Sequence, residues 1–103
     1  RHPRVPAHFE VGWEGAAGRY EARTSDLSEG GCFIDTIVPA APGEEFTFRL
    51  RLPAGGWLEL RGVVTYHYPN TGFGVRFEAA SAEDRRRLVW LVKAEGHKAG
   101  KLP

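Results

Sequence analysis

Residues 44–68 read EEFTFRLRLPAGGWLELRGVVTYHY and carry the clearest strand pattern in the chain. In residues 44–52 apolar and polar side chains alternate, and the apolar face consists of Phe46, Phe48, Leu50 and Leu52. Such an alternation with a period of two is typical of a half-buried β-strand. The Pro-Ala-Gly-Gly sequence at 53–56 predicts a turn, and residues 57–68 continue as a second, longer strand. The stretch therefore predicts a β-hairpin.

The same pattern extends outward from this hairpin. The side chains of residues 57–68 that are predicted to share one face are Leu58, Leu60, Val64, Tyr66 and Tyr68. Further strands are predicted at residues 8–13, 19–24, 31–36 and 73–77. Several short strands with turn chemistry between them favour a small closed barrel over an open sheet. We therefore predict a mainly β fold, a small antiparallel β-barrel of six to seven strands.

The end of the chain has a different period. Ser81 is a suitable N-cap before the acidic residues Glu83 and Asp84, and Asp84 stands at the position of a capping box. Apolar residues follow at helical spacing: Leu88, Leu91 and Val92. We predict a C-terminal α-helix from about Ser81 to Glu95 that packs on the barrel and stops at Gly96. The domain is then residues 1–96, followed by a flexible tail at 97–103.

Length and composition limit the classes of protein to consider. A chain of 103 residues has room for one core but not for a large buried active site. The net charge of +1 argues against a general nucleic-acid binder. With Cys32 as the only cysteine, no intrachain disulfide is possible, and a reducing, cytoplasmic environment fits. The chain has no methionine, so we expect it to be part of a longer protein, with residues before Arg1 that matter.

No catalytic or metal-binding pattern is present in the sequence. The four histidines have no metal-ligand spacing to one another or to Cys32, and surface positions are the expectation for lone histidines. Ser28 lacks a nucleophile motif. The run Arg85-Arg86-Arg87 does not form one basic patch, because successive helix residues diverge by about 100°. We therefore predict a protein that is not an enzyme and that uses no cofactor and no metal.

The remaining candidate is the sequence Asp26-Leu27-Ser28-Glu29-Gly30-Gly31, read with Arg1 and Arg4. Asp and Ser side chains bond to nearby backbone amides and glycine supplies positive φ, so we predict a turn that displays polar groups at a strand end. Guanidinium groups suit both phosphate and the edge of guanine. Arg1, Arg4, Asp26, Ser28 and Gly31 are thus predicted to bind an anion with a planar, hydrogen-bonding body.

In these motifs the chain resembles the PilZ domain, the bacterial receptor module for cyclic di-GMP. The resemblance covers nearly the whole chain, and the combination of motifs in this order is specific. The matching pieces are Arg1-His2-Pro3-Arg4-Val5, Asp26-x-Ser28-x-x-Gly31, Phe33, Gly62-x-Val64-x-Tyr66, Gly72-Phe73-Gly74-Val75-x-Phe77 and Ser81-Ala82-Glu83-Asp84-Arg85.

The resemblance implies a regulatory module that binds cyclic di-GMP and couples the binding to a partner domain or protein. Arg4, with Arg1 or its preceding neighbour, would bind phosphate or guanine, and Asp26 would accept from the guanine N1–H and N2 amine. Ser28 would bond beside Asp26, and Gly31 would let the backbone approach the ligand. Tyr66 is considered as a border of the pocket, although a place in the barrel core is the favoured interpretation for it.

The arginine motif departs from the family pattern, and this leaves an alternative open. The family has two arginines four residues apart, whereas Arg1 and Arg4 are three apart. Either the residue before Arg1 is the missing arginine, or the motif is imperfect. In the second case the chain is a degenerate PilZ-like adaptor that binds protein but no nucleotide. A barrel that binds single-stranded DNA or RNA is disfavoured by the near-neutral charge, and no direct membrane insertion is expected.

Overall fold

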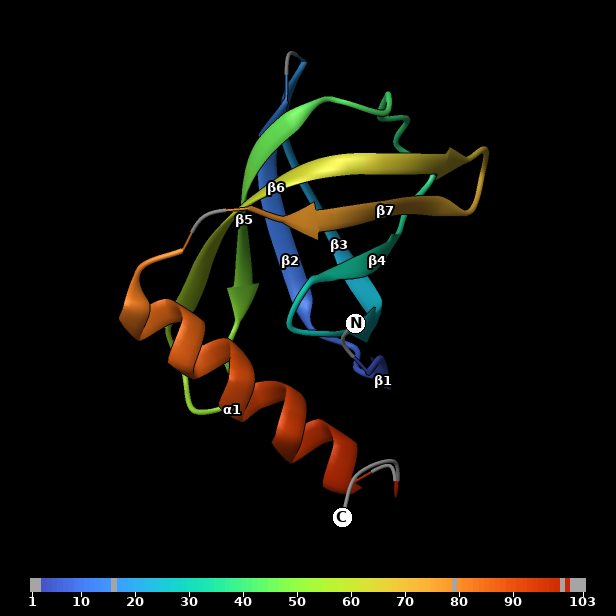
Figure 1. The fold of residues 1–103 in the computed structure, drawn as a ribbon. Helices are drawn as coiled ribbons and strands as arrows, with labels where there is room; N and C mark the ends of the chain where they lie inside the picture. Colours follow the sequence, from blue (N-terminus) through green and yellow to red (C-terminus); the bar gives the residue numbers. More distant parts are fainter. Residues whose placement is uncertain (1–2, 16, 79, 99, 101–103) are drawn as a thin grey trace.

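The structure, a computed structural model, describes residues 3–15, 17–78, 80–98 and 100 and contains seven strands and one helix (Figure 1). The strands are β1 (Val5–Pro6), β2 (Glu10–Gly15), β3 (Gly18–Leu27), β4 (Gly31–Asp35), β5 (Glu45–Arg51), β6 (Trp57–Tyr68) and β7 (Gly72–Phe77). The helix is α1 (Ala82–Lys98). The strong hairpin predicted first is therefore β5 and β6.

The strands form a closed antiparallel barrel. Their order in the sheet is β1-β3-β2-β5-β6-β7-β4, and a further pairing of β3 with β4 closes six of them into the barrel. Strand β1 lies outside this circle and pairs with β3. The predicted fold class, an antiparallel β-barrel with a C-terminal helix, is confirmed.

Aromatic and aliphatic side chains fill the barrel. Trp13 is 1% exposed and packs edge to face on Phe73, with 5.5 Å between the ring centroids. Its ring also lies 5.9 Å from that of Phe48. Burial of one large apolar side chain contributes about 1.5–3 kcal/mol. The inward face predicted for the β5–β6 hairpin is confirmed at Phe48, Leu50, Leu58, Leu60 and Val64, all of which are buried.

A buried threonine fixes the N-terminal segment to the barrel. Thr24 of β3 is fully buried, and its hydroxyl donates to the Ala7 carbonyl at 2.6 Å and accepts from the Phe9 amide at 2.9 Å. Strand β1 precedes this anchor and pairs Val5 with Leu27 and Pro6 with Asp26. Strand β1 was not predicted from the sequence, because a two-residue strand is too short to show a period.

Two β-bulges decide which side chains point outward. The register shifts between Thr24 and Asp26 on β3, and between Val64 and Tyr66 on β6. An extra residue in one strand reverses the alternation beyond it. Tyr66 and Tyr68, predicted on the inward face, are 37% and 57% exposed. The prediction of an inward face and the core interpretation of Tyr66 were therefore wrong.

The C-terminal helix begins as predicted but continues further. The Ser81 hydroxyl accepts from the Asp84 amide at 3.0 Å, which confirms Ser81 as the N-cap. The predicted stop at Gly96 was wrong: Gly96 is a buried helical residue, and α1 includes His97 and Lys98, which had been assigned to the tail. The positive φ that ends a helix occurs at Gly100, with a φ of 71° and an amide that donates to the His97 carbonyl.

The helix covers one end of the barrel. It packs against β1 and β6 through Leu88, Leu91 and Val92, and in Figure 1 it crosses below the barrel on the side where β1 lies. Within the described part of the chain, no helix has both the length and the apolar character needed to cross a membrane.

Candidate ligand-binding site

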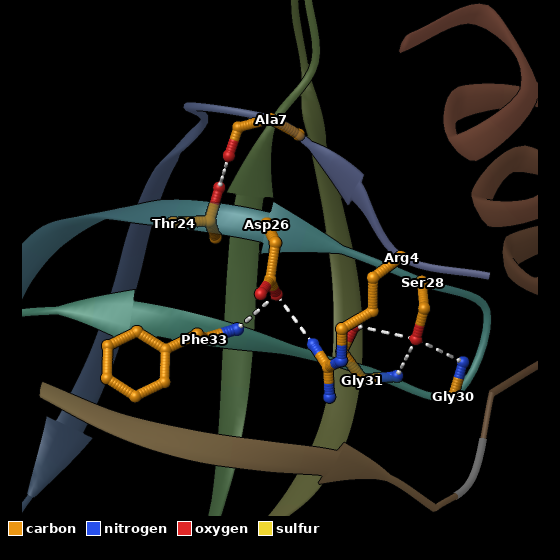
Figure 2. Close-up of polar contacts among 8 residues, drawn as sticks. All are labelled: Arg4, Ala7, Thr24, Asp26, Ser28, Gly30, Gly31 and Phe33. Carbon is orange, nitrogen blue, oxygen red and sulfur yellow. Dashed lines mark hydrogen bonds and ion pairs between the residues drawn. The ribbon is translucent and has the colours of Figure 1, made fainter. Parts of the chain in front are cut away.

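The structure brings Arg4 and Asp26 into contact, although they are 22 residues apart in the chain (Figure 2). Arg4 directly precedes β1, and the pairing of Pro6 with Asp26 places the two side chains on the same part of the outer surface. The Arg4 Nη1 donates to the Asp26 Oδ1 at 2.6 Å. The same Oδ1 accepts from the Phe33 amide at 3.0 Å. Asp26 is thus held from two sides, while its Oδ2 accepts no hydrogen bond from the described residues.

This ion pair is accessible to a ligand. The Arg4 and Asp26 side chains are 47% and 31% exposed. Ion pairs in such exposed positions contribute about 0–1 kcal/mol to stability. An incoming ligand can therefore separate the two groups at small cost. Arg1, the other arginine of the predicted site, lies outside the described residues.

Ser28 holds the turn between β3 and β4. Its hydroxyl accepts from the amides of Gly30 and Gly31, each at 3.1 Å, and lies 3.2 Å from the Gly31 carbonyl, to which it donates. One donor and two acceptor positions are all that a hydroxyl has. Ser28 is 4% exposed. In this structure the side chain is fully used inside the protein.

The turn differs from the sequence prediction in two respects. Asp26 and Leu27 belong to β3, so the connection contains only Ser28, Glu29 and Gly30. Neither Gly30 nor Gly31 has a positive φ. The amide of Ser28 donates to the Gly31 carbonyl at 2.8 Å, and with the bonds of the Ser28 hydroxyl this closes the turn without a left-handed residue. The prediction of a glycine with positive φ was wrong here.

Gly31 is required by the barrel itself. A Cβ atom at this position would lie 2.0 Å from the Val75 carbonyl oxygen of β7, far inside contact distance. Strands β4 and β7 pair Gly31 with Arg76 at this point. The glycine therefore permits the backbone of β7 to approach, whereas the expectation from the sequence was an approach of the backbone to the ligand.

An aromatic platform, defined as Phe33, Tyr66 and Tyr68, lies beside the ion pair. Asp26 pairs with Phe33, Phe33 with Gly74 and Gly74 with Tyr66, so one row crosses four strands on the outer surface. The Phe33 and Tyr66 rings stack at 5.9 Å with an interplanar angle of 29°. Tyr68 lies 5.2 Å from Tyr66, centroid to centroid. Figure 2 shows the Phe33 backbone amide bonded to Asp26, with the ring extending away from the carboxylate.

Gly74 makes room for this platform. A Cβ atom there would lie 2.3 Å from Cε1 of Tyr66, so the tyrosine ring occupies the space that a side chain would fill. Tyr66 had been considered as a border of the pocket, with the barrel core as the favoured interpretation, and Phe33 had been considered only as a motif residue. The signal that predicts the platform is the aromatic pair Tyr66 and Tyr68 opposite the Gly-Phe-Gly sequence at 72–74, but it requires knowledge of the bulge.

These groups have complementary binding chemistry. A carboxylate forms strong, charge-assisted bonds with N–H donors, and a guanidinium forms them with phosphate. Exposed aromatic rings stack on bases. A ligand with a planar base, N–H donors on its edge and a phosphate matches the set.

Cys32 lies next to this site in the barrel, and its thiol is buried. Burial and the nearby Asp26 carboxylate raise the pKa of the Cys32 thiol to about 12, and the Arg4 charge opposes them. A thiol of this kind stays protonated at neutral pH and is a poor nucleophile. Within the described ranges, no group of three or more His, Cys, Asp or Glu side chains is placed to hold a metal ion.

A hollow lies elsewhere on the barrel, and none of the predicted site residues lines it. It has a volume of about 730 Å³, lies over β2 and β3, and reaches Trp57 of β6. Its charged side chains are balanced in sign: Arg19, Arg23 and Arg49 with Glu10, Glu21 and Asp35. This balance gives no preference for an anion, so size alone does not identify the site.

Solved structures of known proteins share this fold. The PilZ domain of Escherichia coli YcgR with cyclic di-GMP has a TM-score of 0.76 and 19% identity, over 96% of this chain and 92% of that one. The Klebsiella MrkH–cyclic di-GMP complex has a TM-score of 0.82 and 20% identity, over 98% of this chain and 54% of MrkH. The Bacillus subtilis motility inhibitor MotI has a TM-score of 0.80 and 17% identity, over 95% and 51%.

The match to a sequence family is stronger evidence of family membership than these structural similarities, which accompany sequence identities of 17% to 20%. This chain spans about half the length of MotI, at 51%, and of MrkH, at 54%. Among curated proteins the sequence has no significant match. The PilZ domain family, in contrast, matches residues 1–94, which is most of the chain and includes the Arg4–Asp26 contact. The chain therefore belongs to the PilZ domain family.

Proposed function

We propose that this chain is a non-catalytic regulatory domain that binds cyclic di-GMP and couples the binding to a partner domain or protein. The observation that carries the proposal is the exposed Arg4–Asp26 ion pair beside the aromatic platform. The pair presents a cation for the phosphate and an anion for N–H donors of the base, and the platform presents partly exposed aromatic rings. Asp26 and the platform are held in place by the strands of the barrel, so their ordering adds little cost when the ligand binds, whereas Arg4 must change its position.

Asp26 selects guanine. Its carboxylate accepts from the guanine N1–H and N2 amine, because Oδ2 is free of bonds from the described residues and Oδ1 keeps only the Phe33 amide once Arg4 has left. Adenine has an unprotonated N1 on the matching edge, which would face the carboxylate without a bond. A site built to bond such donors discriminates strongly against a base that lacks them, because its own polar group is left unpaired.

Arg4 leaves Asp26 when the ligand enters and binds phosphate or the guanine O6/N7 edge. A bidentate contact of arginine with guanine is worth about 1–3 kcal/mol, more than the exposed ion pair that it replaces. Stacking of a base on the aromatic platform adds about 1–3 kcal/mol. Arg1 or the residue before it supplies the second arginine.

Ser28 and Gly31 support this site through the turn. The bonds of the Ser28 hydroxyl fix the turn that follows Asp26. Gly31 lets β4 lie against β7, which places Phe33 in the outer row. We propose that both residues contribute to ligand binding mainly by keeping Asp26 and the backbone amides in position, and that ligand contacts of their own are secondary.

The comparisons support the proposal at the level of the family. The YcgR PilZ domain and MrkH structures contain cyclic di-GMP, and both are longer proteins or parts of them. A second structure of YcgR with cyclic di-GMP extends well beyond the matched part, since this chain covers 47% of it. A similar arrangement here would give the nucleotide an adjoining domain to act on.

A degenerate adaptor is the second candidate, favoured by the three-residue spacing of Arg1 and Arg4. Isothermal titration of the chain, extended by its native residues before Arg1, distinguishes the two. We expect micromolar or tighter binding of cyclic di-GMP, about −8 kcal/mol or better, and much weaker binding of cGMP and cyclic di-AMP. Absence of both heat and ligand-induced NMR shifts would instead establish the adaptor.

A further inference from the structure

We propose that the outward face of α1 is a docking surface for an acidic patch on a partner protein. This basic face is defined as Arg86, Trp90, Lys93 and His97. The proposal rests on the partner coupling in the proposed function and specifies its surface and chemistry. Trp90 provides the first observation: it is 67% exposed, the most exposed aromatic residue in the described part of the chain.

The four residues form one stripe on the helix. Their spacing of four, three and four residues keeps them within about 60° of the helix surface. The apolar residues Leu88, Leu91 and Val92 occupy the opposite side and are buried against the barrel. The stripe therefore points away from the domain, and the fold itself makes no use of it.

The charges on this face lack partners within the described residues. The cations that flank it are paired: Arg87 with Glu83 at 3.5 Å and Lys98 with Glu95 at 3.1 Å. Arg86 and Lys93 form no ion pair with any residue that the structure describes. No acidic side chain belongs to the stripe. Two uncompensated cations around an exposed indole select an anionic surface.

A protein surface fits this arrangement better than a membrane does. Trp and Arg are the residues that most often dominate the affinity of protein interfaces. A membrane-surface helix, in contrast, buries a broad apolar face in the bilayer. Here the apolar face of α1 is already buried on the barrel, and Trp90 is the only large apolar side chain on the outer stripe. A pocket for the indole, rimmed by Asp or Glu, would use all parts of the basic face.

The test uses defined probes and the 103-residue chain without nucleotide, so that a failure here is distinguishable from a failure of nucleotide binding. The chain is titrated with an amphipathic helical peptide that carries Leu and Glu, and with a counterpart in which Lys replaces every Glu. NMR follows the Trp90 indole N–H. We expect the acidic peptide to bind at least about tenfold more tightly, with the largest shifts at Trp90, Arg86 and Lys93.

Variants distinguish binding through the basic face from a general effect of the net charge of the protein. Trp90→Ala and the double variant Arg86→Glu/Lys93→Glu should each weaken binding of the acidic peptide about tenfold or more. The control Arg61→Glu/Arg76→Glu changes net charge equally on two barrel residues of similar exposure, 58% and 59%, and should bind normally. Thermal melts confirm that each variant is folded.

Other occupants would overturn the proposal. Binding only to vesicles of equal parts phosphatidylserine and phosphatidylcholine would identify a membrane surface. Binding only to a single-stranded oligonucleotide would identify nucleic acid. Equal affinity for both peptides, equal weakening by the control variant, or no binding to any probe would show that the basic face is not a site for acidic protein.

Discussion

Asp26 shows how one side chain serves both the fold and the candidate site. Its Oδ1 accepts from the Phe33 amide of the neighbouring strand and from Arg4, while Oδ2 is left for other donors. The sequence motif predicted that Arg4 and Asp26 belong together, and the structure brings these two into contact, while ligand binding by them and by Ser28 stays a prediction. The motif could not predict that the Ser28 hydroxyl is saturated, because that depends on the distances inside a three-residue turn.

Replacement of Arg4 distinguishes a role in nucleotide affinity from a role in the stability of the fold. Arg4→Ala should reduce the affinity for cyclic di-GMP at least about tenfold, or roughly 1.4 kcal/mol. Its ion pair with Asp26 is exposed and contributes about 0–1 kcal/mol, so the melting temperature should change little. Titration calorimetry and thermal melts measure the two quantities.

Arg61→Ala is the matched control for Arg4→Ala. Arg61 forms an ion pair of similar length with Glu45, 2.7 Å, and is 58% exposed on another part of the barrel. Its loss should change neither quantity by a comparable amount. Normal nucleotide binding by Arg4→Ala, together with weak binding by Arg61→Ala, would mean that the site has been assigned to the wrong part of the barrel.

At the level of the elements, side-chain alternation predicted the strands well and their outward faces less well. The bounds of β6 and the inward face of β5 followed from alternation, because both strands are long and half-buried. The bulge before Tyr66 is set by the pairing of β6 with β7. A single sequence does not contain that register, so Tyr66 and Tyr68 were assigned to the inward face and the aromatic platform was not predicted. Strand β1 was missed for the related reason that only its pairing with β3 defines it.

Replacement of Gly31 tests whether this motif residue is required for the stability of the barrel. Gly31→Ala should destabilise the domain by about 1–3 kcal/mol or more, as overpacking does, because the new Cβ meets the Val75 carbonyl at 2.0 Å. Chemical denaturation without ligand measures this loss directly. Gly12→Ala is the control, since a Cβ there would lie 3.5 Å from the Arg49 side chain, an ordinary contact. Equal stability of the two variants would contradict the assigned role of Gly31.

On the scale of the whole molecule, the candidate site and the helix are joined by β1. Arg4 directly precedes β1, and β1 packs against α1, whose outer stripe is the basic face. Strand β1 contains only two residues, lies outside the barrel and directly follows Arg4 of the candidate site. A ligand that moves Arg4 away from Asp26 therefore acts on the strand that supports the helix.

This connection predicts a response of α1 to nucleotide. Addition of cyclic di-GMP should shift the amide NMR signals of Leu91 and Val92, which are buried on the barrel side of α1, as well as those around Asp26. A ligand can alter the helix only as far as it binds one arrangement of β1 better than another. Arg4→Ala should then reduce the shifts in α1 more than those of Phe33, even at saturating nucleotide. Shifts confined to β3 and β4 would show that the barrel isolates the helix from the ligand, and coupling would have to pass through the residues that precede Arg4.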